Sequence, residues 1–218
     1  MLNTEETVTD FDGLRFVVAR YNEDVEWVPK LLSRFPGAKC TIYNKGVPDV
    51  VPTNGYEVLN LDNVGRESHT YLHHIIENYD KLVLSQEEAD EIIVFLQGNP
   101  FDHCRGSSIF HRVHSGVLNI MAGTGFEDIG TNIIEIINGV PTFHMSIRDE
   151  LAQTSQDLFE TVLPNNFQFS AGALFAVSRD CISNRPISFY EKAIGMLDSD
   201  VNPVRGFCFE RLWSLIFG

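Results

Sequence analysis

"EIIVFLQGNPFDHCR", residues 91–105, passes from a run of apolar residues directly into a polar cluster. The apolar run covers residues 92–96, and its length between turn-forming residues predicts a buried β-strand. The cluster that follows consists of Gln97, Gly98, Asn99, Pro100, Phe101, Asp102 and His103. In open α/β sheets, ligands bind at the carboxyl ends of the strands. The transition therefore predicts a ligand-binding edge rather than an ordinary turn.

The segments on either side alternate between strand and helix patterns. Residues 14–20 predict a buried strand, and residues 21–35 carry apolar side chains at helical spacing, with Asn22 or Asp24 as the cap. Further strands are predicted over 39–46, 140–146 and 167–179, and further helices over 66–79, 147–163, 187–198 and 208–218. Residues 104–139 are rich in Gly and Ile and are left unassigned. The alternation predicts an α/β fold with helices on both faces of a layered sheet.

Composition predicts one soluble domain. The chain has 218 residues, of which 44% are hydrophobic and 21% charged, and no linker divides it. A single domain over 1–218 would bury about 70% of its unfolded surface. No apolar run approaches the roughly 20 residues of a membrane span. The acidic start "MLNTEETVTDFDG" lacks the pattern of a signal peptide, so we expect a cytoplasmic protein.

Charge and cysteine spacing restrict the partners. The net charge of −14 repels a nucleic-acid backbone, although a few local cations and backbone N–H groups suffice for a small phosphate-bearing ligand. Cys40, Cys104, Cys181 and Cys208 form no CxxC pair, so free thiols are expected.

Five segments together resemble a known group of sequences. They are VVARYNED (17–24), NVGRESHTYLHHIIENYD (63–80), FLQGNPFDH (95–103), AGALFAVSR (171–179) and ERLW (210–213). They resemble an uncharacterised family of unknown function found in algae, fungi and large viruses.

The order of these segments is also similar to that of GT-A glycosyltransferases. That resemblance implies a Rossmann-like, three-layer α/β/α sandwich with a central mixed, mostly parallel sheet. It implies nucleotide-sugar binding by Ala19, Arg20, Tyr21, Asn22, Glu23, Asn63, Gly65, Arg66, Gln97, Gly98 and Asn99. It also implies that the acceptor or sugar lies at Ala171 and Gly172, and that Glu210 in a C-terminal helix acts as the catalytic base.

The metal-binding motif of GT-A enzymes is altered in this chain. Where the pattern has Asp-x-Asp, the chain has Gln97-Gly98-Asn99. Neutral amides bind Mn²⁺ and Mg²⁺ more weakly than carboxylates do, so the dependence on a divalent cation is an open question. Asp102 and His103 could complete a weak metal site, or Arg66 and Arg105 could neutralise the diphosphate directly.

Each of these motifs also has a purely structural explanation. Asn22 is a common helix cap, and the segment 63–67 could be a loop followed by an acid in the first turn of a helix. The small residues Ala171 and Gly172 could serve close packing. Glu210 could be an exposed helical glutamate, although its apolar neighbours would raise its pKa if it is buried.

The histidines suggest a different chemistry. His69 and His73 are four residues apart on one predicted helix, and His111 and His114 are three apart; both spacings can bind zinc.

The predicted function is nonetheless a glycosyltransferase that moves a hexosyl or pentosyl group from a nucleoside-diphosphate sugar to a hydroxyl acceptor, a glycan or glycoprotein. The alternatives are a non-catalytic nucleotide- or carbohydrate-binding module and a histidine-based, metal-dependent hydrolase.

Overall fold

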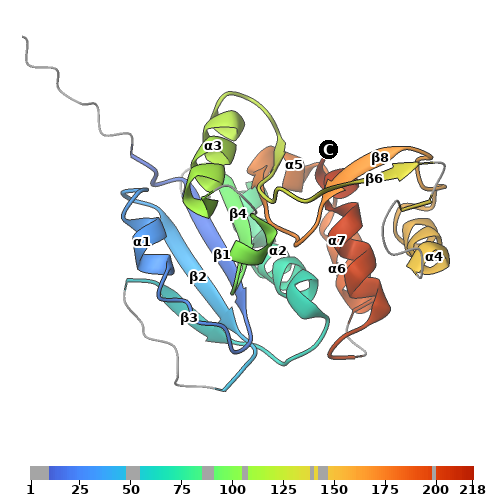
Figure 1. The fold of residues 1–218 in the computed structure, drawn as a ribbon, viewed down its shortest axis with the longest axis horizontal. Helices are drawn as coiled ribbons and strands as arrows, with labels where there is room; N and C mark the ends of the chain where they lie inside the picture. The colour runs from blue at the N-terminus through green and yellow to red at the C-terminus, as the bar shows by residue number, and fades with distance from the viewer. Residues whose placement is uncertain are drawn as a thin grey trace, which may run out of the picture.

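The computed structural model describes residues 10–47, 55–84, 91–104, 108–137, 140–141, 147–197 and 200–218. The chain forms an α/β structure built on a six-stranded mixed sheet, with a smaller three-stranded antiparallel sheet beside it (Figure 1). Among the helices described, none is long and apolar enough to cross a membrane. All four cysteines are free.

The large sheet has the strand order β3-β2-β1-β4-β9-β5. The parallel strands are β1 (Leu14–Arg20), β2 (Lys39–Asn44), β3 (Glu57–Asn60) and β4 (Ile92–Gln97). The last two strands, β9 (Phe175–Ser178) and β5 (Phe126–Asp128), run antiparallel to their neighbours. The sheet is therefore mixed but mostly parallel, and the predicted strand over 92–96 is its β4.

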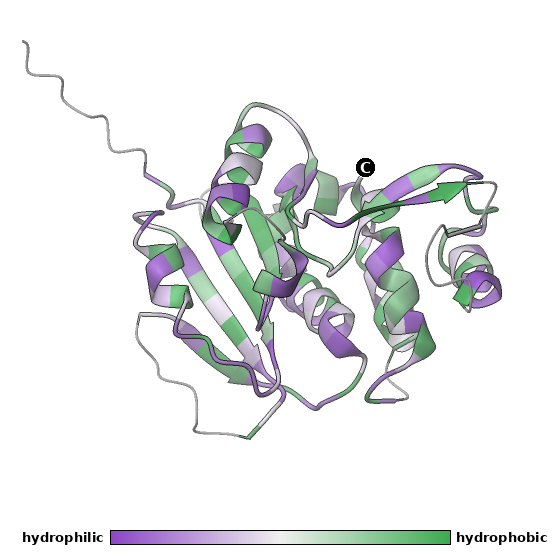
Figure 2. Cartoon of the chain, viewed as in Figure 1, coloured by the Kyte–Doolittle hydropathy of each residue, from purple (hydrophilic) through white to green (hydrophobic). Residues whose placement is uncertain are grey.

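Alternate residues of the strands enter two separate hydrophobic clusters, as the period of a β-strand requires. Val17 and Phe95 are register partners in one cluster, to which α2 (Arg66–Leu84), α6 (Ile187–Gly195) and α7 (Val204–Phe217) contribute. Val18 and Leu96 are partners in the other, to which α1 (Val28–Leu32) and α3 (Ile109–Met121) contribute. Hydrophobic residues accordingly dominate the central strand β4 (Figure 2).

The predicted strand over 167–179 is wrong, because two strands in two different sheets occupy this segment. β8 (Phe167–Ser170) pairs with β6 (Ile133–Ile137) in the small sheet, whereas β9 pairs with β4 in the large one. Between them Gly172 and Ala173 both have positive φ, 101° and 48°. A strand cannot continue through left-handed backbone, so the chain turns here and changes sheet.

The helix predicted over 21–35 is much shorter than expected. Only Val28–Leu32 is helical, and neither Asn22 nor Asp24 caps it, since the Asp24 carboxylate accepts the backbone N–H of Glu26 at 2.8 Å. Pro29 at the start of the helix favours this late beginning.

The remaining helices and strands complete the order of elements along the chain. The unassigned residues 104–139 contain α3, β5 and β6, and they follow the short 3₁₀ helix η1 (Phe101–His103). The others are β7 (Val140–Pro141), α4 (Arg148–Phe159) and α5 (Arg179–Ser183). The strand predicted over 140–146 is described only at 140–141, and the rest of it lies outside the described residues. Of the predicted helices, the last begins at Val204 rather than Cys208.

Candidate functional site

A cavity of about 370 Å³ lies at the carboxyl ends of the parallel strands. The ends of β1, β2 and β4 contribute to it, together with the start of α2 and the segment before α7. Its lining residues are Ala19, Arg20, Tyr21, Glu23, Lys45, Asn63, Arg66, Glu67, Gln97, Val201 and Asn202. Seven of these were predicted to bind a nucleotide sugar: Ala19, Arg20, Tyr21, Glu23, Asn63, Arg66 and Gln97.

Arg20 shapes the turn that follows β1. Its guanidinium group donates to the backbone carbonyls of Glu23 at 2.9 Å and Tyr21 at 3.0 Å, and to the Asn44 side chain at 2.6 Å. The Glu23 carboxylate in turn accepts the backbone N–H of Tyr21 at 2.6 Å. Because Arg20 is only 7% exposed, it is mainly a scaffold of this wall. The predicted Asn22 is exposed and does not line the cavity.

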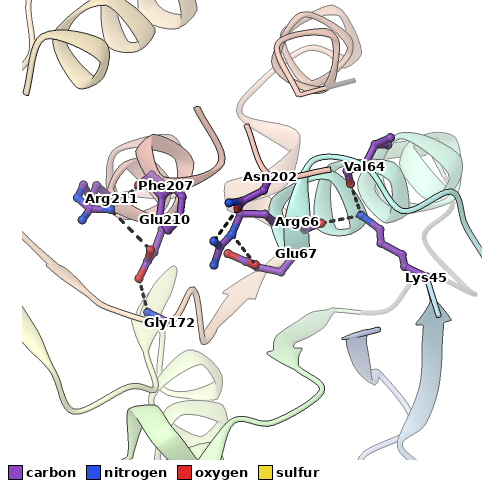
Figure 3. A network of polar contacts seen from close by, with 9 residues as sticks. All are labelled: Lys45, Val64, Arg66, Glu67, Gly172, Asn202, Phe207, Glu210 and Arg211. Carbon is purple, nitrogen blue, oxygen red and sulfur yellow. Dashed lines mark hydrogen bonds and ion pairs between the residues drawn. The ribbon is translucent and has the colours of Figure 1, made fainter. Parts of the chain in front are cut away.

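Lys45, the residue after β2, braces the loop that leads into α2. Its ammonium group donates to the carbonyl oxygens of Val64 and Arg66, both at 2.6 Å (Figure 3). Burial lowers the pKa of Lys45 from its ordinary 10.5 to about 8, and the charge of Glu67 partly opposes that shift. Lys45 therefore keeps its positive charge at neutral pH while it lines the cavity.

The chain enters α2 through two residues with left-handed backbone, Gly65 and Arg66. Gly65 and Arg66 have φ of 64° and 56°, and a side chain at Gly65 would collide with His69 and Leu197. The Arg66 guanidinium donates to Asn202 at 3.0 Å and stacks over the Phe207 ring at 4.1 Å. Non-glycine residues in this region are strained, and such strain is concentrated at functional sites.

The cavity has a local excess of positive charge in a chain of net charge −14. Its lining contains three cations, Arg20, Lys45 and Arg66. Against them stand two acids, Glu23 and Glu67. Burial raises the pKa of Glu67, an effect that the Arg66 charge and a backbone N–H oppose and that Glu210 reinforces. The arrangement suits an anionic ligand.

Glu210 on α7 contacts the turn between β8 and β9, residues 171–174. Its carboxylate accepts the backbone N–H of Gly172 at 2.6 Å and lies 3.6 Å from the Arg211 guanidinium (Figure 3). The predicted acceptor residues Ala171 and Gly172 thus lie beside the predicted base. Glu210 itself does not line the cavity. The Glu67 side chain, which does line it, points from α2 toward Glu210 (Figure 3). The charge of Glu210 contributes to the raised pKa of Glu67.

The residues at the end of β4 line two different cavities. Gln97 lines the first, but the exposed Asn99 lines a second one of about 450 Å³ with Trp27, Lys30 and Phe101. The Asn99 amide donates to the Asp102 carboxylate at 2.9 Å, and the Gly98 carbonyl accepts the Trp27 indole N–H at 2.9 Å. The predicted Gly98 and Asn99 therefore stabilise their own turn. Glu23 lines both cavities.

Within the described ranges, no group of three His, Cys, Asp or Glu side chains is close enough to hold a metal ion. Asp102 is bonded to Asn99, and the ring of His103 packs against Gly172. His69 and His73 are stacked 6.4 Å apart on α2, and His114 packs on Phe35. Arg105 lies outside the described residues. Of the four polar side chains at 97–103, Gln97 and Asn99 are neutral amides, which bind Mn²⁺ and Mg²⁺ more weakly than carboxylates do.

Sequence reasoning missed Lys45, Val201 and Asn202, and it included Glu67 in the segment 63–67 without giving it a role in binding. Lys45 and Glu67 are polar residues at a strand end and a helix start, so their positions carried a readable signal. Val201 and Asn202 precede α7 and reach the cavity only through long-range packing, which no local pattern records.

The sequence model of one family matches residues 16–102 and 136–218. The chain belongs to the family described as "Protein of unknown function (DUF3431)". Every residue that lines the first cavity lies within the matched ranges, whereas α3 and β5 lie outside them. No curated protein matches the chain at a significant level.

Proposed function

We propose that this member of the family is a glycosyltransferase of GT-A type, which moves a sugar from a nucleoside-diphosphate sugar to a hydroxyl acceptor. The observation that carries the proposal is the cavity at the ends of β1, β2 and β4, which gathers Lys45, Arg66 and the start of α2. Ligands of doubly wound sheets bind where the strand order reverses, and the reversal here falls between β1 and β4.

The architecture supports the same proposal. The mixed, mostly parallel sheet has hydrophobic clusters on both faces, as a three-layer α/β/α sandwich requires. The segments that resemble GT-A motifs, 19–23, 63–67 and 97, meet at one cavity although they are far apart in sequence. The Gly172 turn and Glu210 lie next to each other, as an acceptor region and its base would.

The reaction would proceed by direct displacement. The acceptor hydroxyl oxygen attacks the anomeric carbon of the donor and passes its proton to the Glu210 carboxylate, while the bond from that carbon to the diphosphate oxygen breaks. Lys45 and Arg66 bind the departing diphosphate and neutralise its charge, and the configuration at the anomeric carbon inverts. The hydrogen bond from Gly172 holds the Glu210 carboxylate in one orientation.

A binding experiment tests the site first. We expect UDP, GDP or CMP to raise the melting temperature of the wild-type protein, with and without Mn²⁺. Arg66→Gln should lose this shift, whereas Arg34→Gln should retain it, because Arg34 lies on Phe110 away from the cavity. A wild-type protein that no nucleotide stabilises would contradict the proposal.

A turnover experiment then separates a transferase from a binding module. Glu210→Gln should lose at least about 100-fold in donor turnover while nucleotide binding persists. Glu191→Gln, on the exposed side of α6, is the matched control and should remain active. If wild-type protein binds nucleotide but never turns over a donor, it is the non-catalytic module, a reading that the engaged Glu210 carboxylate and the amides of Gln97 and Asn99 favour.

A further inference from the structure

The Glu67 carboxylate faces the cavity with one oxygen that no described residue binds. The side chain is 9% exposed, and it lines the cavity at the first turn of α2. Its Oε2 lies 3.5 Å from the Arg66 Nε atom, whereas its Oε1 is buried without a hydrogen-bond partner among the described residues. Leaving a buried polar atom unpaired costs about 1–3 kcal/mol, and more for a charged group. Several other buried side-chain atoms of the described residues also lack a partner, but Glu67 Oε1 is the carboxylate oxygen among them.

A second buried group lies one turn further along α2. Tyr71 is fully buried among Phe95, Phe175 and Trp213, and its hydroxyl has no partner among the described residues. The charges of Glu67 and Glu210 act on this hydroxyl and, after burial itself, raise the pKa of Tyr71. An unpaired acceptor on Glu67 and an unpaired donor on Tyr71 thus lie one turn apart on α2, and neither satisfies the other.

The chemistry of Glu67 selects the group that it can bind. Burial and the nearby Glu210 raise the pKa of Glu67, so the side chain is either a carboxylate or a neutral acid. As a carboxylate it repels phosphate and accepts only from donors. A sugar hydroxyl suits both forms, because it donates as well as accepts. Phosphates instead match Lys45 and Arg66, which line the same cavity.

We propose that Glu67 is a specificity-determining residue, which binds a hydroxyl of a sugar ring whose attached phosphates lie at Lys45 and Arg66. The inference rests on the proposed function and adds to it which part of the ligand the acidic side of the cavity recognises. The hydroxyl belongs either to the ribose of the nucleotide or to the transferred sugar. Glu67 contributes binding and discrimination, and Glu210 keeps the proton transfer.

The test is a comparison of affinities by isothermal titration calorimetry. The ligands are pyrophosphate, the more stabilising of UDP and GDP, the dideoxyribose form of that nucleotide, and its glucose-bearing form. Wild-type protein should bind the hydroxylated ligand about 10- to 100-fold more tightly than the form without that hydroxyl, as a hydrogen bond to a charged partner provides. Glu67→Leu should abolish that ratio and bind pyrophosphate equally well or more tightly.

Two further variants show whether an effect of Glu67→Leu comes from the lost carboxylate or from misfolding. Glu67→Gln retains the shape and one acceptor oxygen, and it should keep most of the ratio. Glu77→Leu, on the exposed side of the same helix, is the matched control and should behave as the wild type. If Glu67→Leu loses the preference for the ribose nucleotide over its dideoxyribose form, Glu67 binds a hydroxyl of the ribose. If Glu67→Leu instead loses the additional affinity that the attached glucose provides, Glu67 binds a hydroxyl of the transferred sugar.

The two ways of failing are distinct. If neither pyrophosphate nor any nucleotide binds the wild-type protein, the proposed function and this inference are both wrong. If the nucleotides bind and both ratios survive in folded Glu67→Leu protein, the inference alone is wrong.

Discussion

The Glu210 carboxylate on α7 binds the backbone N–H of Gly172 at 2.6 Å, although 38 residues separate the two in sequence. Gly172 has φ of 101°, and a Cβ atom placed there would lie 2.3 Å from the His103 ring. The carboxylate therefore holds a turn that only glycine forms without strain.

Replacing Gly172 by alanine should destabilise the protein. The left-handed backbone and the collision with His103 together should lower the free energy of unfolding by about 2–4 kcal/mol. Urea denaturation measures the change. Gly195→Ala is the control, because a Cβ atom at this end of α6 meets nothing within 4 Å, and it should be neutral or slightly stabilising. Equal midpoints for the two variants would contradict the prediction.

The stability of the protein should depend on Lys45 above neutral pH. Burial lowers the pKa of Lys45 from 10.5 to about 8, so between these values the unfolded chain binds the proton more tightly than the folded one. The cost of burying the charge is fully present below pH 8, and stability rises with pH in this window. Relative to Lys45→Met, the wild type should gain up to about 1.4 kcal/mol per pH unit.

Urea denaturation at several pH values between 8 and 10 checks this slope. Lys81→Met, at an exposed position of α2, should run parallel to the wild type. Parallel curves for Lys45→Met and the wild type would show that Lys45 does not titrate early.

Asp128, at the end of β5, should make the stability of the protein depend on pH in the opposite direction from Lys45. Burial raises its pKa from 3.8 to about 6, so in this range the folded chain binds the proton more tightly and stability falls as pH rises. Asp128→Asn should therefore stabilise the protein above pH 6, by about 1–3 kcal/mol.

Thermal denaturation at pH 8 and pH 4 tests the Asp128 prediction. The advantage of Asp128→Asn should shrink toward zero at the lower pH, where the native carboxyl is already protonated. The exposed Asp80→Asn should show no such change. A stabilisation that is the same at both pH values would arise from packing rather than titration.

The large sheet was predictable where a local pattern and the tertiary packing agree. The apolar run at 92–96 is buried as expected in β4, and the periodicity of 66–79 lies within α2. α3 was missed although Ile109, Val113, Val117 and Ile120 recur at helical spacing and are all buried. This spacing is typical of an amphipathic helix and is sufficient to predict α3.

Other features could not be predicted from local patterns. Apolar residues continue on both sides of the turn at Gly172 and Ala173, and a glycine within a strand pattern does not by itself predict a change of sheet. Asn99 has the right residue type for ligand binding, but its amide is bonded to Asp102 within its own turn. Lys45 acquires its partners only when the loop before α2 folds back on β2. The change of sheet and the contacts of Lys45 depend on segments distant in sequence, whereas the bond of Asn99 to Asp102 is local.

The β8–β9 turn limits how this protein can be redesigned. Ser170 pairs with Ile133 in the small sheet, and Phe175 pairs with Phe95 in the large one, so only four residues connect the two registers. An insertion there would shift one sheet against the other and pull Gly172 away from Glu210. Loop grafting or domain fusion should therefore avoid this junction and use the exposed turn at 121–124 after α3, outside the ranges that the family model matches.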